Sequence, residues 1–268
     1  MDLFSNSKVV VGMIHVQALP GTPRHQQPLA EISATAEAEA RALAAAGVDG
    51  LLIENMHDLP YLCGTVGPEI IAGMTAVGAA VRRASDLPLG VQILAAANRE
   101  ALAAAQGCGA KFVRVENFAY AHVADEGLMP TAEAGPLLRY RKQIGADDIA
   151  IIADVKKKHS SHALTADVSL AEAALTTQFV GADGLVVTGT ATGQPTAVDD
   201  VRTVRQAVQV PVCIGSGLTP ENLPSLWPYA DVFIVGSYLK VDGVWSNALD
   251  GDRTRKFMET AKRLRAAD

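Results

Sequence analysis

Eight short apolar segments, separated by alanine-rich segments with helical spacing, recur along the chain. The apolar segments are rich in Val and Ile and span residues 9–14, 50–53, 89–94, 112–115, 149–153, 184–187, 210–214 and 231–235. The alanine-rich segments 32–46, 99–106, 169–179 and 198–208 repeat apolar residues every three or four positions, as an amphipathic helix does. A regular alternation of strand and helix indicates an α/β fold.

Glycines close several of the predicted helices in a similar way, at Gly47, Gly109 and Gly181. Glycine adopts the positive φ that ends many helices. Near-continuous apolar strands are typical of a parallel sheet that is buried on both faces. Eight such units in 268 residues predict a single (β/α)₈ TIM barrel over residues 1–268. An open six-stranded sheet with an extra lobe is the alternative.

Composition excludes several classes of function. The net charge of −6 and the lack of a basic run argue against nucleic acid as a partner. No apolar run approaches the roughly 18 residues of a membrane helix, and no secretory signal begins the chain, so we expect a cytoplasmic protein without membrane insertion. The three cysteines lack CxxC spacing, which gives no support for a disulfide framework or a zinc site.

Glycine-rich loops follow the last two predicted strands, at residues 215–222 and 236–240. TIM barrels commonly hold a phosphate group in these two loops, through backbone N–H groups and a short helix. Thr219 and Pro220 have the residue types of a helix start. Lys240 could contact the ligand or face solvent, and the glycines could serve tight turns alone. The predicted phosphate-binding residues are Gly189, Gly215, Ser216, Gly217, Gly236 and Ser237.

Polar residues stand at the ends of the other predicted strands, where TIM barrels carry their chemistry. Carboxylates that are partly excluded from water gain proton affinity and act as general acids or bases. Buried ion pairs that only hold the barrel together are the structural alternative. The candidate catalytic residues are His15, Glu54, Glu116, Asp154 and Lys156, and the candidate substrate-binding residues are Asn55, Gln92, Arg114, Asn117 and Thr188.

Lys156 has two interpretations. A desolvated amine beside other cations loses its proton readily and could form an imine with a carbonyl substrate. Because Lys157 and Lys158 adjoin it, a solvated or anion-binding charge run is the favoured interpretation. No HxH or HxxxH spacing indicates a metal site, no cofactor is identified, and a divalent cation stays open. A long loop over residues 56–75, with Pro60 and Pro68, has the position of a segment that covers an active site.

With these residues in place, the sequence resembles the BtpA/SgcQ family. The resemblance rests on VGMIH at 11–15, LPGTP at 19–23, GVDG at 47–50, IEN at 53–55, RVEN at 114–117, DVKKKH at 154–159, VTG at 187–189 and GSGLT at 215–219. It implies a TIM-type barrel with a phosphate site like that of ribulose-phosphate-binding barrels. One family member is associated with photosystem I accumulation, and another with a sugar-phosphate uptake and metabolism cluster, so the family does not fix a reaction.

Two functions follow from this pattern. The first is an enzyme that binds a phosphorylated sugar or ribosyl compound at the mouth of the barrel and acts by acid–base chemistry, as an isomerase, epimerase or lyase. Hydrolysis uses similar residues and stays open. The second is an assembly or regulatory factor that keeps the phosphate-ligand pocket without catalysis. Both take a phosphorylated small molecule as the ligand, and both leave a homo-oligomer open.

Overall fold

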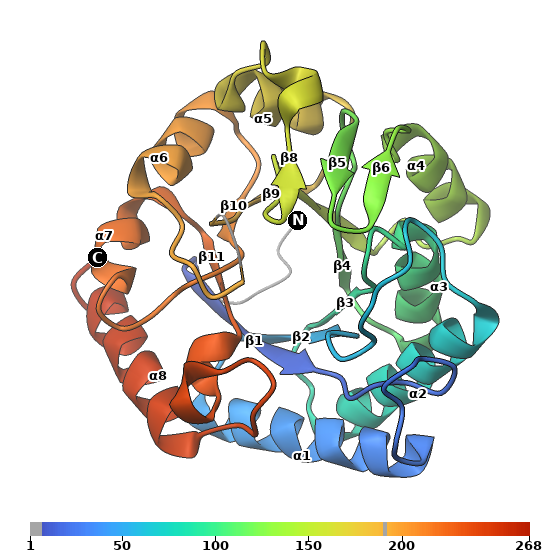
Figure 1. Ribbon diagram of the computed structural model, residues 1–268. Helices are drawn as coiled ribbons and strands as arrows, with labels where there is room; N and C mark the ends of the chain where they lie inside the picture. Colours follow the sequence, from blue (N-terminus) through green and yellow to red (C-terminus); the bar gives the residue numbers. More distant parts are fainter. Residues whose placement is uncertain (1–6, 190–191) are drawn as a thin grey trace.

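A closed barrel of eight parallel strands forms the centre of the computed structural model, which describes residues 7–189 and 192–268 (Figure 1). Around the barrel the order is β1-β11-β10-β9-β7-β4-β3-β2. Each predicted apolar segment is one strand of this barrel, with ends that differ by at most two residues, which confirms the predicted fold. The strands are β1 (Val9–His15), β2 (Gly50–Glu54), β3 (Leu89–Gln92), β4 (Phe112–Val115), β7 (Ala150–Asp154), β9 (Gly184–Val187), β10 (Val212–Ile214) and β11 (Val232–Val235).

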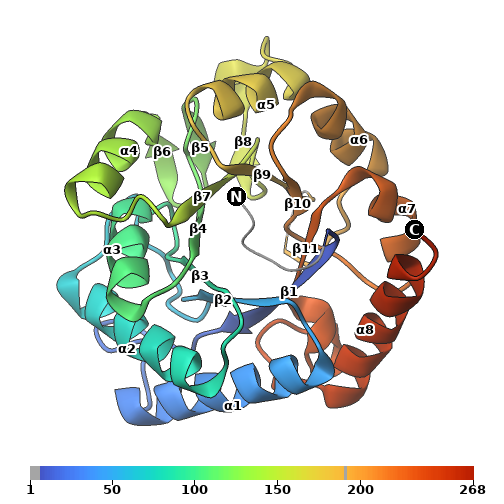
Figure 2. The same ribbon diagram turned by 180° about the vertical axis from the view of Figure 1, so that it is seen from behind.

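Helices surround the barrel as an outer ring, which Figure 2 shows from the opposite side. As predicted, α1 and α3 end at glycines in the left-handed conformation, Gly47 with φ 89° and Gly109 with φ 73°. Among the helices of the described residues, none has both the length and the hydropathy that a membrane span requires. They are α1 (Leu29–Ala46), α2 (Pro68–Ala84), α3 (Asn98–Cys108), α4 (Ala134–Gln143), α5 (Leu170–Phe179), α6 (Val198–Ala207), α7 (Leu223–Leu226) and α8 (Gly251–Arg265).

The loop predicted over residues 56–75 is shorter in the structure, because α2 begins at Pro68. Proline is favoured in the first turn of a helix, where its missing N–H would have no intrahelical acceptor. Gly78, farther along α2, serves close packing between helices. A Cβ on Gly78 would lie 2.6 Å from the Sγ atom of Cys108 on α3, so only glycine lets the two helices approach this closely.

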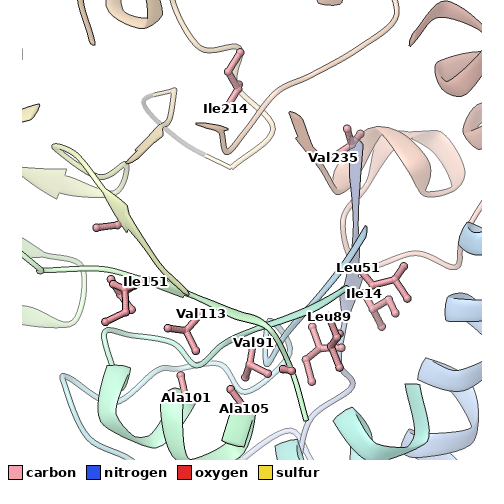
Figure 3. Close-up of a cluster of buried hydrophobic side chains, with 14 of the residues drawn as sticks. Ile14, Leu51, Leu89, Val91, Ala101, Ala105, Val113, Ile151, Ile214 and Val235 are labelled. Atoms are coloured by element: carbon pink, nitrogen blue, oxygen red, sulfur yellow. The ribbon is translucent and has the colours of Figure 1, made fainter. Parts of the chain in front are cut away.

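Two apolar layers follow from the alternation of side chains along each strand. Residues that point outward meet the helices: Val91 and Val113 point toward Ala101 and Ala105 of α3 (Figure 3). Residues that point inward line the lower part of the barrel and form a second apolar cluster: Val9, Val11, Met13, Leu52, Phe112, Ala150, Ile152, Val186, Cys213 and Ile234. The upper part of the barrel is thereby left to the next inward-pointing residues, which are polar.

A small antiparallel sheet lies beside the mouth of the barrel and was not predicted. It has the order β6-β5-β8 and is called the mouth sheet below. Its strands β5 (His122–Ala124) and β6 (Gly127–Met129) follow β4, whereas β8 (Ser160–Ser161) follows β7. Short 3₁₀ helices complete the loops: η1 (Ala163–Thr165), η2 (Trp227–Tyr229), η3 (Ser237–Leu239) and η4 (Val241–Gly243).

Candidate functional site

The polar residues at the strand ends continue the inward-pointing sets of the barrel. Within β1 the inward side chains are those of Val9, Val11 and Met13, so the period of two places His15 on the same face. In the same way, Glu54 lies on the inward face two residues after Leu52, and Asp154 lies there two residues after Ile152. In the sheet register, His15 pairs with Glu54, and Glu54 pairs with Gln92. Most of the predicted catalytic set therefore forms a polar layer above the apolar interior.

Arg114 and Asp154 form the floor of this polar layer. The Arg114 Nε atom lies 2.8 Å from Oδ1 of Asp154, and Nη2 lies 2.9 Å from Oδ2. Both side chains are at most 3% exposed. Such a bidentate pair is the strong form of a charge-assisted hydrogen bond. Gly215 is also explained here, because a Cβ at this position would lie 3.0 Å from Nη2 of Arg114 and 2.5 Å from the side chain of Val186.

His15 is a neutral imidazole in this environment. Burial and the charge of Lys240 lower the pKa of His15 to about 3. Its Nδ1 atom lies 2.9 Å from the carbonyl oxygen of Trp245, which can only accept, so Nδ1 carries the proton and Nε2 presents a lone pair. A Cβ on Gly236 would lie 3.0 Å from this Nε2. The acceptor atom of His15 therefore faces the loop that follows β11.

Glu54 is a buried carboxyl with a raised proton affinity. Removal from water raises the pKa of Glu54 above its ordinary value of 4.5, although the positive charges of Arg114 and Lys158 act in the opposite direction. Its register partner Gln92 has a buried Oε1 atom without a hydrogen-bond partner among the described residues. A carboxyl with a raised proton affinity is suited to donate a proton to a ligand.

Glu116 is held from two sides. Its Oε2 atom accepts from the backbone N–H of Ala96 at 3.1 Å and lies 3.2 Å from Nζ of Lys157. Asn98 fixes the backbone of Glu116 through two further hydrogen bonds, to its N–H and to its carbonyl oxygen. The carboxylate therefore enters the mouth of the barrel in a fixed orientation.

The three consecutive lysines have different surroundings and do not form one solvated charge run, whereas anion binding by them stays a prediction. Lys156 adopts φ 45°, in the left-handed region, and this turn breaks the alternation that would put it beside Asp154. Its Nζ instead donates to the carbonyl oxygen of Val168 at 2.5 Å, before α5. Lys157 is 6% exposed and pairs with Glu116. Lys158 lines the cavities at the mouth of the barrel.

Gly189, Ser216 and Gly217 pack against the loop that follows β9. The Ser216 Oγ atom accepts from the N–H of Gly189 at 2.8 Å and donates to the carbonyl oxygen of Gln194 at 3.3 Å. A Cβ on Gly217 would lie 2.1 Å from the same oxygen, and one on Gly189 would lie 2.4 Å from it. Close packing accounts for these glycines, and their direct contact with a phosphate group stays a prediction.

The helix start predicted at Thr219 and Pro220 is wrong by three residues, because α7 begins at Leu223. Thr219 and Asn222 form a turn in front of it. The Thr219 N–H donates to Oδ1 of Asn222 at 2.9 Å, and the Asn222 N–H donates to the Thr219 hydroxyl at 3.4 Å. Such side-chain turns compete with the first turn of a helix.

Lys240, in the loop that follows β11, contacts the outer ring of helices. Lys240 is 1% exposed, and its Nζ lies 2.7 Å from both carboxylate oxygens of Glu39 on α1. It contacts a helix and faces neither solvent nor the cavities. Ser237 lies at the start of η3 and lines the cavities together with Gly236.

Arg253 is a cation at the same loops that the sequence pattern did not reveal. It belongs to α8, where its Nε donates to the carbonyl oxygen of Tyr238 at 2.7 Å and its guanidinium lies 4.3 Å from the centre of the Tyr238 ring. It lines a cavity of about 400 Å³ with Gly217, Gly236 and Ser237. A positive charge fixed beside two glycine turns is suited to hold an anionic group.

Asn55, Asn117 and Thr188 hold loops in place. The Oδ1 atom of Asn55 accepts from the N–H of Leu94 at 2.7 Å. Asn117 donates from Nδ2 to a backbone carbonyl between β6 and α4 at 2.7 Å, and it lines a separate cavity beside α5. Thr188 accepts from the backbone N–H of Lys158 at 3.0 Å. The contacts of Asn55 and Thr188 position the residues that line the mouth.

Three adjoining cavities form one cleft, called the mouth cleft below. The first, of about 790 Å³, contains the side chains of Glu54, Gln92, Glu116 and Lys158. The second, of about 360 Å³, shares Glu54 and Lys158 with the first. It shares Gly217, Gly236 and Ser237 with the third, where Arg253 lies. Sequence reasoning missed several residues that line the cleft: Met56, Tyr61, Glu126, Lys157, Lys158, Thr192, Trp245 and Arg253.

His159 connects the mouth sheet to the loop that follows β9. Its Nε2 accepts from the backbone N–H of Thr192 at 3.0 Å, and its Nδ1 lies 3.4 Å from Oδ2 of Asp125, in the turn between β5 and β6. The histidine therefore ties two segments together at the edge of the mouth cleft.

Comparison with solved structures agrees with the fold. Thiamine phosphate pyrophosphorylase from Pyrococcus furiosus superposes with a TM-score of 0.59 at 14% sequence identity, covering 96% of each chain. Phosphoribosyl anthranilate isomerase from Thermus thermophilus superposes with a TM-score of 0.58 at 13% identity, covering 96% of this chain and 99% of that one. Identities this low show that the fold is shared.

Sequence comparison identifies the family. An uncharacterized protein of Caenorhabditis elegans, whose name carries the label mitochondrial, is 44% identical over 98% of this chain and 96% of its own length. The photosystem I biogenesis protein BtpA of Synechocystis is 35% identical over 97% of this chain and 91% of its own length. Residues 6–263 match the BtpA family, and the chain belongs to this family.

Proposed function

We propose that this protein is an enzyme that binds a phosphorylated sugar or ribosyl compound in the mouth cleft and transforms it by acid–base chemistry, as an isomerase, epimerase or lyase. The observation that carries the proposal is the continuity of the cleft. Gly217, Gly236 and Arg253 line one end, and Glu54 and Glu116 line the other. An anion held at the first end would place the remainder of the ligand against the carboxyls.

The loops that follow β10 and β11, together with Arg253, would bind the phosphate group. TIM barrels with a phosphate site use the corresponding loops. The names of the solved structures support the same ligand class, since thiamine phosphate pyrophosphorylase, phosphoribosyl anthranilate isomerase and 3-hexulose-6-phosphate synthase all name phosphorylated compounds.

Glu54 is the proposed general acid, because burial raises its pKa and it lies on the path between both ends of the cleft. Neutral His15 would accept a hydrogen bond through Nε2 from a ligand hydroxyl near Gly236. Glu116 and Lys157, as a buried pair, would orient the sugar hydroxyls. Asp154 would act through Arg114, whose guanidinium it holds beneath the cleft.

A thermal-shift titration with D-ribulose 5-phosphate, D-ribose 5-phosphate and inorganic phosphate, with and without Mg²⁺, tests the binding step. A ligand that binds only the folded state raises Tm. Arg253→Gln should weaken the response roughly tenfold to a hundredfold in affinity, as loss of a charge-assisted hydrogen bond does. Arg255→Gln is the matched control, because Arg255 lies on the same helix, is exposed and pairs with Asp252.

An assembly or regulatory factor is the competing function, which the name of the Synechocystis relative favours. It predicts that the sugar phosphates stabilise the protein without turnover and that Glu54→Gln leaves its biological role intact. Conversion of a bound sugar phosphate that is lost in Glu54→Gln, with binding retained, would contradict this function. A cytoplasmic location and a homo-oligomeric state complete the proposal, to be checked by cell fractionation and by light scattering.

A further inference from the structure

Lys158 differs from its two neighbours in the surroundings of its amine. The Nζ atoms of Lys156 and Lys157 are both engaged, the first by the carbonyl oxygen of Val168 and the second by Glu116. Within residues 7–189 and 192–268, no hydrogen bond or ion pair involves the Nζ of Lys158. Lys158 also lines both cavities that Glu54 joins. Lys158 therefore lines the middle of the mouth cleft, and its amine has no partner among the residues that the structure describes.

The charges around Lys158 favour the neutral amine. Burial and the positive charge of Arg114 lower the pKa of Lys158, although Glu54, Asp154 and Glu116 oppose this effect. Asp154 is already bound to Arg114 through both oxygens. Glu116 is bound to Lys157, and burial raises the pKa of Glu54, which favours its neutral form. Two of the three nearby carboxyls are thus engaged by other cations, and the third has a raised proton affinity. In its neutral form the Lys158 amine is a nucleophile.

On the basis of the function proposed above, we propose that the Nζ atom of Lys158 attacks the carbonyl carbon of a phosphorylated aldehyde or ketone and forms an imine with it. The N–C bond forms as the carbonyl π electrons move to oxygen, and a proton passes from nitrogen to that oxygen. Glu54 then donates its proton to the resulting hydroxyl, which leaves as water while the nitrogen lone pair forms the C=N bond. The product is a protonated imine beside ionised Glu54, and addition of water reverses the sequence.

The imine narrows the substrate class. A protonated imine accepts the electron pair of a neighbouring C–H or C–C bond, which suits an isomerase or a lyase acting next to a carbonyl group. The ligand must then carry a phosphate at one end and a carbonyl group within the span between Arg253 and Lys158. Open-chain sugar phosphates and phosphorylated keto acids have this arrangement.

Reductive trapping tests the proposal. The wild-type protein is incubated with D-ribulose 5-phosphate, D-ribose 5-phosphate or dihydroxyacetone phosphate in the presence of cyanoborohydride. The intact mass should rise by that of the compound less one oxygen atom, and peptide mapping should locate the adduct at Lys158. Lys158→Met should abolish the adduct, and Lys156→Met should keep it as the matched control. Dihydroxyacetone, which lacks the phosphate, should label at least tenfold more slowly.

Three results are decisive. Preferential labelling of Lys158 in the wild type supports the proposal even if Lys158→Met does not fold. A compound that raises Tm but labels surface lysines such as Lys142 no less than Lys158 overturns the imine and leaves the proposed function in place. In that case Lys158→Arg should bind the compound with the same affinity, because binding would need only the positive charge of the side chain. If no compound raises Tm or labels Lys158, the proposed function and the imine both fail.

Discussion

Arg114 and Asp154 join neighbouring strands β4 and β7 through two hydrogen bonds at 2.8 and 2.9 Å, in the interior of the barrel. The pair lies between the apolar interior and the mouth cleft, and Gly215 lies directly against it. A carboxylate with both oxygens bound to a guanidinium is a fixed support. The floor of the cleft is therefore a buried ion pair held in a fixed orientation.

Removal of one partner of this pair should be costly. Asp154→Ala leaves the Arg114 guanidinium buried without its counterion, and we expect a loss of about 3–5 kcal/mol in the free energy of unfolding. Asp148→Ala, which breaks the exposed pair with Lys111, should cost less than about 1 kcal/mol. Urea unfolding measures both. Equal losses in the two variants would show that the buried pair is not a structural support.

The double variant Arg114→Met with Asp154→Leu removes both buried charges while it keeps side chains of similar size. It therefore distinguishes the effect of an unpaired charge on stability from that of lost packing. Apolar replacements of similar volume often restore the stability that is lost when one partner of a buried pair is removed. We expect the double variant to be more stable than Asp154→Ala in the same urea experiment. A double variant that is no more stable than Asp154→Ala would contradict this expectation.

Gly217 and Gly145 offer a matched pair, with φ values of 66° and 68°. Alanine at either position bears a similar strain of about 1–2 kcal/mol. At Gly145 no atom lies within 4 Å of the added Cβ, whereas at Gly217 the carbonyl oxygen of Gln194 would lie 2.1 Å away. Gly217→Ala should therefore lower the stability by an additional 1–3 kcal/mol or so and weaken phosphate binding. Equal Tm losses would contradict the close approach of the two loops.

His15 should make the protein less stable in acid. The pKa of His15 is lowered to about 3 in the folded protein from its ordinary value of 6.5, which applies to the unfolded chain. Between these two pH values the unfolded chain therefore binds more protons than the folded protein. The contribution of neutral His15 to stability is therefore fully present above pH 6.5 and is lost as the pH falls toward 3, by an amount on the order of 5 kcal/mol. The slope of unfolding free energy against pH should be smaller in His15→Asn. Parallel profiles for the two proteins between pH 6.5 and 4.5 would refute this assignment.

His159→Ala should loosen the mouth sheet without affecting the barrel. The substitution removes the acceptor for the N–H of Thr192 and the contact with Asp125. Hydrogen exchange of residues 122–129 should accelerate, because local opening depends on the few contacts that hold a segment. Exchange in β1 and β2 should stay unchanged. His25→Ala, at an exposed position, is the control, and faster exchange throughout the chain would argue against a local role.

The barrel could be predicted from the sequence because its signals are local. Each strand is an apolar run, and glycine ends helices such as α1 at Gly47. The polar layer could be predicted for the same reason, since the period of two that places Met13 inward also places His15 inward. These rules act over a few residues and need no knowledge of distant contacts.

The remaining features depend on the chain beyond the local pattern. The period of two fails after Asp154 because Lys156 takes a left-handed backbone, which residue type alone does not indicate for lysine. Arg253 enters the cleft from α8 through contacts with Tyr238, and its position in a charged helix gives no sign of this. The strands of the mouth sheet are only two or three residues long, too short for a periodic signal.

The left-handed turn at Lys156 has a consequence for the comparison of family members by alignment. In a run of three identical residues, a gap can be moved by one position without any change in the alignment score. Such a shift would exchange the amine of Lys158 for that of Lys157, which is bound to Glu116. The number of lysines in the run therefore does not identify the residue equivalent to Lys158. Only its distance from Asp154 along the chain does. Relatives with a lysine four residues after this aspartate should be compared first.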